Sequence, residues 1–330
     1  MSATVIDGVR LGKEIRAEVA VEVARLGATG LKPGLAVVIV GDDPASRVYV
    51  RSKGKACLEA GMHSETIELH ASVSEAELLA TIDRLNADAA IHGMLVQLPL
   101  PKHINTEAVL RRVDAAKDVD GFHPVNVGKL VISDRTALRP ATPYGVQQML
   151  VRSGIETRGA HAVIVGRSTI VGRPMAGLLL QDGPGGNATV TVCHSRSRDL
   201  PSITRLADIL IVAIGKPEFV TAEMVRPGAV VIDVGINRVS DASAPKGYRL
   251  VGDVAYGPVA EVASAITPVP GGVGPLTNAL LLAHLVRAAQ AQEFSAPPAG
   301  SPVPARALAQ PSADRPATVA ADPVAASRGH

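Results

Sequence analysis

The segment from residue 162 to residue 177 constrains the fold more than any other part of the chain. It reads Ala162-Val-Ile-Val-Gly-Arg-Ser-Thr-Ile-Val-Gly-Arg-Pro-Met-Ala-Gly177, a short apolar strand followed by a glycine turn and a helix start. Free backbone N–H groups and the positive end of the helix dipole make such a turn an anion site. Against the common G-x-G-x-x-G pattern the chain offers Gly166, Ser168 and Val171, so an ordinary strand-to-helix turn remains the alternative to phosphate binding.

The turn after the next apolar run indicates which dinucleotide the chain binds. Residues 188–193 predict the second strand of the same unit, and a dinucleotide fold reads the ribose at the end of that strand. That end carries Ser195 and Arg196 within the basic turn 194–198, where an NAD site usually has Asp or Glu. A hydroxyl and a cation suit a 2′-phosphate, so the sequence predicts NADP, with a solvated basic turn as the alternative.

Composition argues against several classes of protein. With 330 residues and 47% hydrophobic side chains, the chain has room for about two domains. A net charge of +2 and an aromatic content of 2% predict no nucleic-acid partner. No secretion signal is present and no apolar run approaches the roughly 20 residues that span a membrane, so we expect no membrane partner. Cys57 and Cys193 lack paired spacing, which argues against a disulfide framework or a zinc site and fits a reducing cytoplasm.

Strand-like apolar runs alternate with helical stretches over most of the chain. The predicted strands lie at 35–40, 66–69, 91–97, 162–165, 189–193, 209–214 and 230–234, which indicates an α/β fold with mostly parallel sheets. Apolar residues three or four apart predict a first helix that ends near Gly27, and Pro275 opens a last helix that reaches about Gln292. Residues 295–330 are rich in Ser, Ala and Pro, so we predict a disordered tail without a catalytic role.

Tyr49 and Lys53 are the first candidates for chemistry. They lie four residues apart on a predicted helix that ends at Gly61, so both side chains can reach one ligand. Tyrosine can stack on a planar ring, and a lysine becomes a base only when its pKa falls from about 10.4. A surface lysine beside a partly buried tyrosine is the alternative. Gln97 follows a predicted buried strand, where ligand sites of open α/β sheets lie, and can meet a substrate or position Lys53.

Two loops have an unusual composition. Residues 114–126 concentrate three acids, Asp120 among them, with His123, but no pair has a metal-ligand spacing, so we predict no metal site and a solvated acidic turn is the alternative to binding. The second loop, Pro270-Gly-Gly-Val-Gly-Pro275, ends at a helix start. Its glycines imply that backbone approaches a ligand or another loop closely, and a rigid turn between domains is the other interpretation.

Six motifs in order resemble the bifunctional methylenetetrahydrofolate dehydrogenase/methenyltetrahydrofolate cyclohydrolase family over about residues 4 to 290. They are Tyr49-x-x-x-Lys53, Val96-Gln97-Leu-Pro-Leu-Pro101, Lys117-Asp-Val-Asp120-Gly-Phe-His, Pro140-Ala-Thr-Pro143, Gly166-Arg-Ser168-x-x-Val-Gly172-x-Pro174 and Pro270-Gly-Gly-Val-Gly-Pro275-Leu-Thr277. Ala141 and Leu276 depart from the residues that are common in that family, cysteine and methionine, at positions without obvious chemistry.

The resemblance implies oxidation of 5,10-methylenetetrahydrofolate by NADP⁺, followed by hydration of the methenyl product to 10-formyltetrahydrofolate at the same cleft, without a metal. It implies that Lys53 is the acid/base group of the cyclohydrolase step and that Gln97 tunes and orients it. Tyr49 would pack against the folate, and Asp120 would hydrogen-bond the pterin edge. The resemblance further implies that Gly166, Arg167 and Ser168 contact the cofactor phosphates, that Ser195 and Arg196 contact the 2′-phosphate, and that Ile236 contacts the nicotinamide end. The residues that would line the folate side are Pro270, Gly271, Gly272 and Thr277.

The resemblance also implies a two-lobed architecture, with a Rossmann-like NADP-binding domain (144–270) inserted into a discontinuous α/β catalytic domain (1–143 with 271–292). It implies a cytoplasmic homodimer in one-carbon metabolism, which serves purine, methionine and histidine biosynthesis. Three alternatives remain: a dehydrogenase with weak or no cyclohydrolase activity, a non-catalytic nucleotide-binding or scaffold protein, and a shikimate-like NADP dehydrogenase. Intact Lys53 and Gln97 argue against the first two, and the loop that begins at Pro270 argues against the third.

Overall fold

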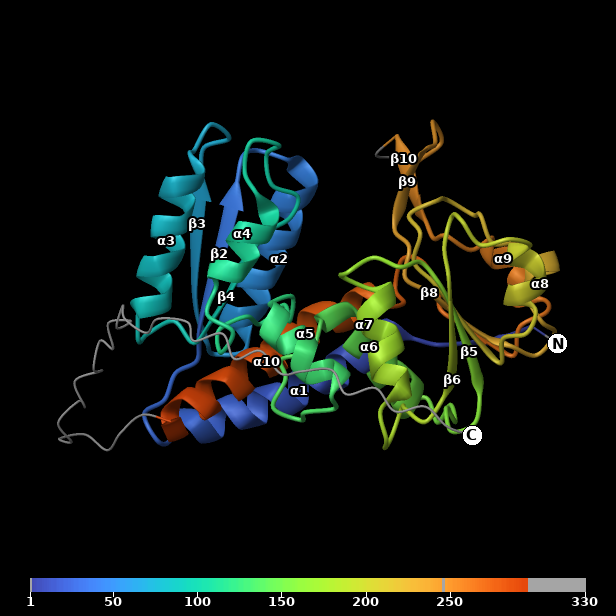
Figure 1. Ribbon diagram of the computed structural model, residues 1–330, viewed down its shortest axis with the longest axis horizontal. Coiled ribbons are helices and arrows are strands. Elements are labelled where there is room, and N and C mark those ends of the chain that lie inside the picture. The colour runs from blue at the N-terminus through green and yellow to red at the C-terminus, as the bar shows by residue number, and fades with distance from the viewer. Residues whose placement is uncertain (1, 245–246, 296–330) are drawn as a thin grey trace, which may run out of the picture. The chain divides into compact units, whose positions relative to one another are not determined.

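Two parallel sheets organise the part of the chain that the computed structural model describes, residues 2–244 and 247–295 (Figure 1). One sheet has three strands and the other has six, and every pairing within them is parallel. A separate antiparallel hairpin joins β9 (Asn237–Ser240) to β10 (Tyr248–Val251). The predicted α/β class with parallel sheets is therefore confirmed. The predicted tail lies outside the described residues, apart from Ser295.

The smaller sheet contains β2 (Gly34–Val40), β3 (His63–Leu69) and β4 (Gly93–Val96), with β2 in the centre. Every residue of β2 is buried, as the unbroken apolar run of a parallel strand requires. Alternate residues of β2 enter two different cores because side chains of a strand alternate between its faces. Three helices that follow these strands are α2 (Pro44–Glu59), α3 (Glu75–Ala87) and α4 (Thr106–Arg112).

The larger sheet has a doubly wound core. Its strands, from one edge to the other, are β1 (Thr4–Val5), β11 (Ala265–Ile266), β8 (Val230–Asp233), β7 (Ile209–Val212), β5 (His161–Val165) and β6 (Thr189–Cys193). After β6 the chain crosses to the other side of β5 to form β7. Ligands of open α/β sheets bind at such a switch point, beyond the carboxyl ends of the strands. The turn that follows β5 is therefore the expected ligand position.

The remaining short helices lie between and after these strands. They are α5 (Pro124–Val131), α6 (Ala141–Arg152), α7 (Gly172–Leu180), α8 (Leu200–Thr204), a 3₁₀ turn at Ala222–Met224 and α9 (Tyr256–Ala260). Helix α7 packs against β5, β6, α5 and α6. It therefore starts directly beside the switch point of the larger sheet.

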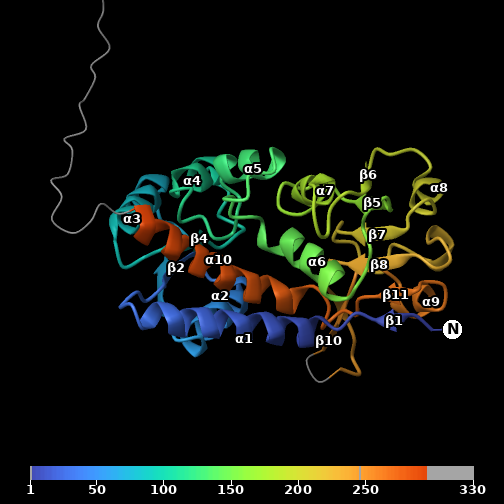
Figure 2. The ribbon, with the colours of Figure 1, turned by 90° about the horizontal axis from the view of Figure 1, so that it is seen from below.

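Two long helices, α1 (Gly8–Gly27) and α10 (Gly274–Ser295), lie side by side in both views (Figures 1 and 2). The Asp7 side chain caps α1 by accepting the backbone N–H of Arg10 at 3.0 Å. A Cβ on Gly12 would lie 3.0 Å from the carbonyl oxygen of Pro275, so the two backbones approach closely. The predicted end of α1 at Gly27 is confirmed, and α10 begins at Gly274, one residue before the predicted start.

Other sequence-based expectations have mixed outcomes. The hairpin β9–β10 and the two-residue strands β1 and β11 were not predicted, because short or polar segments carry no apolar run. Strand β1 belongs to the larger sheet although it lies within the predicted catalytic domain, whose boundaries stay a prediction. Among residues 2–244 and 247–295, no cluster of three or more His, Cys, Asp or Glu side chains could hold a metal ion, and no helix is long and apolar enough to cross a membrane. Cys57 and Cys193 are free and buried.

Candidate functional site

Lys53 and Gln97 meet where α2 passes the end of β4. The Lys53 Nζ donates to Gln97 Oε1 at 3.3 Å, and both side chains are half-buried. Gln97 is held on both sides, because its backbone N–H donates to the Val38 carbonyl at 2.8 Å and its Nε2 donates to the Leu98 carbonyl at 2.8 Å. These bonds turn the amide oxygen toward the lysine. The predicted pairing of Lys53 with Gln97 is thus present in the structure.

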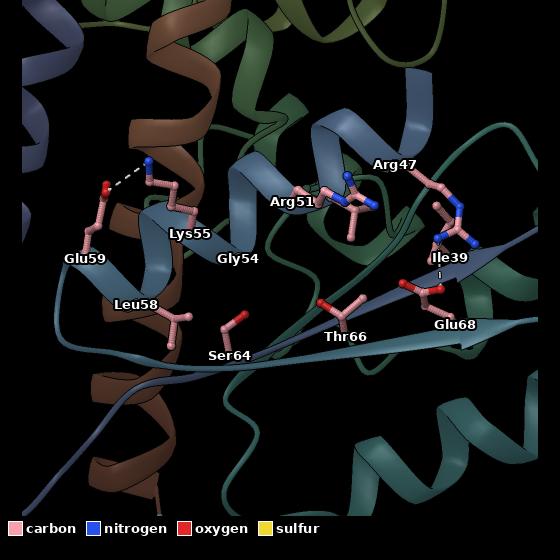
Figure 3. Close-up of a pocket in the computed structure, with 11 residues that line it drawn as sticks. Ile39, Arg47, Arg51, Gly54, Lys55, Leu58, Glu59, Ser64, Thr66 and Glu68 are labelled. Atoms are coloured by element: carbon pink, nitrogen blue, oxygen red, sulfur yellow. Dashed lines mark hydrogen bonds and ion pairs between the residues drawn. The ribbon is translucent and has the colours of Figure 1, made fainter. Parts of the chain in front are cut away.

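Tyr49 lies one turn before Lys53 on α2 and is 46% exposed, so its ring is available to a ligand. The opposite face of α2 borders a separate pocket of about 470 Å³ with β3 (Figure 3). Arg47, Arg51 and Lys55 line it from the helix, and Arg47 pairs with Glu68 at 3.0 Å. None of the predicted site residues is among the described residues that line this pocket. The catalytic candidates therefore share one face of α2.

The loop around Asp120 is shaped by its neighbour Asp118. The Asp118 carboxylate accepts the backbone N–H groups of Phe122 at 3.2 Å and His123 at 2.7 Å, and the Asn126 side chain donates to it at 2.9 Å. Asp118 is buried, and this burial raises the pKa of its carboxyl group. The alternative of a solvated acidic turn is therefore wrong for Asp118. The half-buried Asp120 accepts no hydrogen bond from the described residues, which leaves its carboxylate available to a ligand.

Lys117, in the same motif, has a structural role that the sequence did not reveal. Its Nζ donates to the carbonyl oxygens of Leu85 at 3.1 Å, Asn86 at 2.8 Å and Asp88 at 2.8 Å. Carbonyl groups at the end of a helix lack hydrogen-bond donors within the helix. At the end of α3, the Lys117 ammonium group is the donor to these carbonyl groups. Burial lowers the pKa of Lys117. Lys117 therefore joins this loop to α3 and is not free for catalysis.

A buried histidine of α10, His284, contacts the backbone of the same loop. The His284 Nδ1 lies 3.1 Å from the carbonyl oxygen of Val119, and its ring stacks on Tyr144 with centroids 5.6 Å apart. Complete burial lowers the pKa of His284 to about 4, so the ring is neutral at pH 7 and donates from Nδ1. Val119 precedes Asp120, so His284 fixes the backbone next to Asp120, the residue expected to bind the pterin.

The loop that contains Pro270, Gly271 and Gly272 packs tightly on the start of α1. A Cβ on Gly8 would collide with the carbonyl oxygen of Gly272, and a Cβ on Gly272 would collide with the carbonyl oxygen of Pro268, so close packing accounts for a glycine at both positions. Thr277, at the start of α10, lies 3.2 Å from Thr142 between their hydroxyl oxygens. The approach of another loop, which the sequence left open beside ligand binding, is therefore present.

The turn after β5 has the backbone geometry of an anion site. Gly166 has a φ of +135°, and a Cβ there would collide with the carbonyl oxygen of Ala213. A Cβ on Gly172 would in turn collide with the carbonyl oxygen of Gly166, so neither position tolerates a side chain. The Ser168 Oγ accepts the backbone N–H of Val171 at 3.1 Å, which fixes the turn, and Arg167 is exposed. The turn leads directly into α7, which begins at Gly172.

A cavity of about 300 Å³ lies at this turn. Its lining residues come from the turn after β5, the turn after β6 and the segment after β7: Val165, Gly166, Arg167, Ser168, His194, Ser195, Leu200, Ala213, Ile214, Lys216 and Phe219. Arg196 is exposed beside it, and its backbone N–H donates to His194 Nδ1 at 3.1 Å. The Lys216 Nζ lies 5.4 Å from the centroid of the Phe219 ring. Sequence reasoning missed Lys216, although its place after a predicted strand was a usable signal.

Ile236 lies where the two halves of the site approach each other. It follows β8 and is 47% exposed. Its Cδ1 would be 3.7 Å from a Cβ at Gly274, the first residue of α10. The loop that begins at Pro270 leads to that residue, so the residue that the resemblance assigns to the nicotinamide end lies beside the loop that it assigns to the folate. Such an arrangement can hold a reduced carbon of one ligand against a hydride acceptor.

Comparison with protein families matches the chain to two models. Residues 6–120 match the model described as tetrahydrofolate dehydrogenase/cyclohydrolase, catalytic domain. Residues 140–293 match the model described as tetrahydrofolate dehydrogenase/cyclohydrolase, NAD(P)-binding domain. The first range contains Lys53, Gln97 and Asp120, and the second contains the turn after β5.

Individual relatives agree with these matches. The chain is 56% identical over 288 residues to bifunctional protein FolD 1 of Myxococcus xanthus, which covers 87% of this chain and 98% of that protein. It is similar in structure to the bifunctional enzyme FolD of Campylobacter jejuni, with a TM-score of 0.83, 45% identity and coverage of 88% and 100% of the two chains. The Trypanosoma brucei FolD complexed with NADP cofactor and inhibitor matches with a TM-score of 0.84, 41% identity and coverage of 89% and 99%.

Proposed function

Because the chain belongs to the tetrahydrofolate dehydrogenase/cyclohydrolase family, we propose that Lys53 and Gln97 form the catalytic pair of a bifunctional folate enzyme. The protein oxidises 5,10-methylenetetrahydrofolate to 5,10-methenyltetrahydrofolate with NADP⁺ and hydrolyses the product to 10-formyltetrahydrofolate. The observation that carries the proposed pair is the 3.3 Å contact from Lys53 Nζ to Gln97 Oε1. The same contact argues against the alternative of a dehydrogenase with weak or no cyclohydrolase activity.

Lys53 acts as the proton acceptor in the hydration step. Its Nζ donates one hydrogen to the fixed Gln97 amide oxygen, which holds the nitrogen in place while its lone pair accepts a proton from the attacking water. Tyr49 packs against the folate ring, and the free Asp120 carboxylate accepts N–H groups of the pterin. Pro270, Gly271, Gly272 and Thr277 line the folate side.

The turn after β5 and the cavity of about 300 Å³ fit the phosphates of a dinucleotide. When bound there, NADP⁺ would supply the hydride acceptor for oxidation of the folate methylene carbon. Arg167 and Ser168 would bind the phosphates with backbone N–H groups and side chains, and Gly166, whose N–H donates to the Cys193 carbonyl, would leave room for them. Ser195 and Arg196 bind the 2′-phosphate, and Ile236 limits the position of the nicotinamide end. Hydride transfer then depends on how these residues hold the two ligands at reacting distance.

The assembly and the location of the protein are further parts of this proposal. We place the boundaries between a catalytic domain and an inserted NADP-binding domain near residues 143 and 271; the first lies close to residue 140, where the second family match begins, and the second lies within that match. We propose a homodimer formed through the NADP-binding domains, and a location in the cytoplasm, which the two free buried cysteines suit. Sedimentation of the purified protein tests whether it is a homodimer.

An absorbance assay tests the function directly. With 5,10-methylenetetrahydrofolate and NADP⁺, we expect absorbance of methenyltetrahydrofolate to rise and then to decay as the product is hydrolysed. Supplied methenyltetrahydrofolate should decay faster with enzyme than without it, in the absence of NADP⁺. A rise without enzymatic decay would support the dehydrogenase alternative, and no rise would contradict the proposed function.

A further inference from the structure

Two buried carboxylates lie beneath the proposed cofactor site. Asp233 ends β8, and Asp253 follows β10; their side chains are 3% and 0% exposed. A buried carboxylate is stable only where hydrogen-bond donors surround it. The donors around this pair come from segments that are far apart in the sequence.

Asp253 connects two of those segments. Its Oδ2 accepts the backbone N–H groups of Ile214 at 2.7 Å and Gly215 at 2.9 Å. Its Oδ1 accepts from the Asn237 side chain at 2.9 Å. A Cβ on Gly235 would collide with this carboxylate, so the backbone before Asn237 also lies directly against it. One side chain thus fixes the segment after β7 and the segment after β8.

Asp233 holds Asp253 in its position. It accepts the backbone N–H groups of Gly235 at 2.9 Å, Asp253 at 3.0 Å and Val254 at 2.9 Å. The backbone N–H of Asp233 donates to the Thr267 hydroxyl at 2.8 Å. Thr267 lies just before the loop that begins at Pro270. The network therefore extends from the cofactor side toward the loop that precedes α10.

Both segments that Asp253 fixes contribute to the proposed cofactor site. Ile214 lines the cavity with Gly166, Ser168 and Ser195. Ile236, the proposed nicotinamide contact, lies between Gly235 and Asn237 in the chain. The spacing between these two walls sets where the two ends of the cofactor can lie. An error of a fraction of an ångström in that spacing slows a transfer that depends on near-attack geometry.

We propose that Asp253 is a positioning residue for hydride transfer, which fixes the Ile214–Gly215 segment and Ile236 relative to each other through its bonds to two backbone N–H groups and Asn237. This proposal rests on the proposed cofactor site. It predicts that disturbing the Asp253–Asn237 contact impairs the dehydrogenase, which needs NADP⁺, and spares the cyclohydrolase, which does not.

A swap of the two side chains tests the proposal. In Asn237→Asp, a second carboxylate replaces the amide that donates to Asp253, so kcat/KM for NADP⁺ should fall about 10- to 100-fold. In Asp253→Asn, the amide oxygen can still accept both backbone N–H groups and the Asn237 amide can turn to accept from the new NH₂ group. We expect that variant within about threefold of wild type. The double variant Asn237→Asp/Asp253→Asn restores a donor and an acceptor and should recover to the same range.

Each variant is assayed for both reactions and for thermal unfolding. Cyclohydrolase activity on supplied methenyltetrahydrofolate, without NADP⁺, should stay within about twofold of wild type in all of them. Asp241→Asn, at a half-buried carboxylate that accepts from Ser243 in the β9–β10 hairpin, is the matched control and should change neither reaction. If Asn237→Asp does not fold, Asn237→Ala replaces it, with an expected fall of about 3- to 10-fold confined to the dehydrogenase.

Equal losses of both activities in Asn237→Asp, or no recovery in the double variant, would overturn the proposal. An unchanged dehydrogenase in Asn237→Asp would do so as well. A wild-type protein without NADP⁺-dependent oxidation would instead contradict the proposed function, so the two failures are distinguishable.

Discussion

On the folate side the predicted side chains already touch, whereas on the cofactor side they lie exposed on separate turns. Lys53 and Gln97 form a hydrogen bond of 3.3 Å. Arg167, Ser195 and Arg196 are exposed, and the backbone beneath them is what the structure fixes. The difference follows from the chemistry, because a proton acceptor must be held at a set position, while a phosphate is bound by N–H groups and flexible cations.

The two reactions report on the two sides separately. Hydration of the methenyl substrate needs only the folate side, and oxidation of the methylene substrate needs both sides. A substitution on either side can therefore be assigned by its effect on two assays of the same preparation. The four predictions below compare the two sides, in order of decreasing effect.

Replacing Lys53 should give the largest effect. Lys53→Met keeps the length of the side chain but removes the proton acceptor, so cyclohydrolase activity should fall about 10²- to 10⁴-fold. The measurement is the decay of supplied methenyltetrahydrofolate. Lys55→Met, on the exposed side of α2, is the matched control and should be near wild type. Hydration within about threefold of wild type in Lys53→Met would rule out the proposed role.

Stability against pH should differ in sign between the two sides. Burial raises the pKa of Asp233, beneath the cofactor side, from 3.8 to about 6, and Asp253 is the neighbouring ionisable group. Between pH 3.8 and about 6, Asp233 holds a proton in the folded protein but not in the unfolded chain. The contribution of Asp233 to the free energy of unfolding therefore falls by about 3 kcal/mol as pH rises through this range. Burial lowers the pKa of His284, beneath the folate side and near Arg139 and Arg287, from 6.5 to about 4. There the unfolded chain binds the extra proton, so stability rises by about 3 kcal/mol as pH rises from 4 to 6.5.

Denaturant unfolding at pH 4 to 7 measures both contributions by subtraction. The difference between wild type and Asp233→Asn should decline toward pH 6, and the difference between wild type and His284→Asn should increase toward pH 6.5. Parallel curves for wild type and a variant would show that the substituted group does not titrate in this range.

Asp120 should affect folate more than NADP⁺. Asp120→Asn replaces a charged acceptor of pterin N–H groups, and such a bond contributes about 1.5 to 3 kcal/mol, or about 10- to 100-fold in affinity. Titration with each ligand is the measurement. Asp114→Asn, an exposed acid of the same loop, is the control. Equal losses for both ligands would instead indicate that Asp120 shapes the loop, as Asp118 does.

Arg196 should give the smallest of these effects. Arg196→Ala removes one exposed phosphate contact, so the KM for NADP⁺ should rise about tenfold while the weak reaction with NAD⁺ stays nearly constant. Arg158→Ala, exposed in the same half of the chain, is the control. If both cofactors are affected equally, the basic turn is only a solvated surface.

The sequence predicted the parts of the fold that rest on local patterns. The strand at 162–165 and the helix that ends at Gly27 follow from apolar spacing, and the structure places them there. The pairing of Lys53 with Gln97 followed from the rule that sites lie at the carboxyl ends of strands. The burial of Asp118, Lys117 and Asp253 could not be predicted, because an acid or a lysine in a loop is usually solvated and its hydrogen-bond partners are distant in sequence.

The pairing of β1 with β11 has a consequence for how the chain is made. Thr4 lies beside Ala265, so two strands from opposite ends of the sequence complete one edge of the larger sheet. Because β11 pairs with β8, the edge of β8 stays open on the ribosome until nearly the whole chain has emerged. Contacts of such long sequence separation slow folding, and an open strand edge can pair with other chains. Strand β1 therefore stays unpaired until Ala265 and Ile266 have been synthesised, and during that period the open edge of the sheet can aggregate.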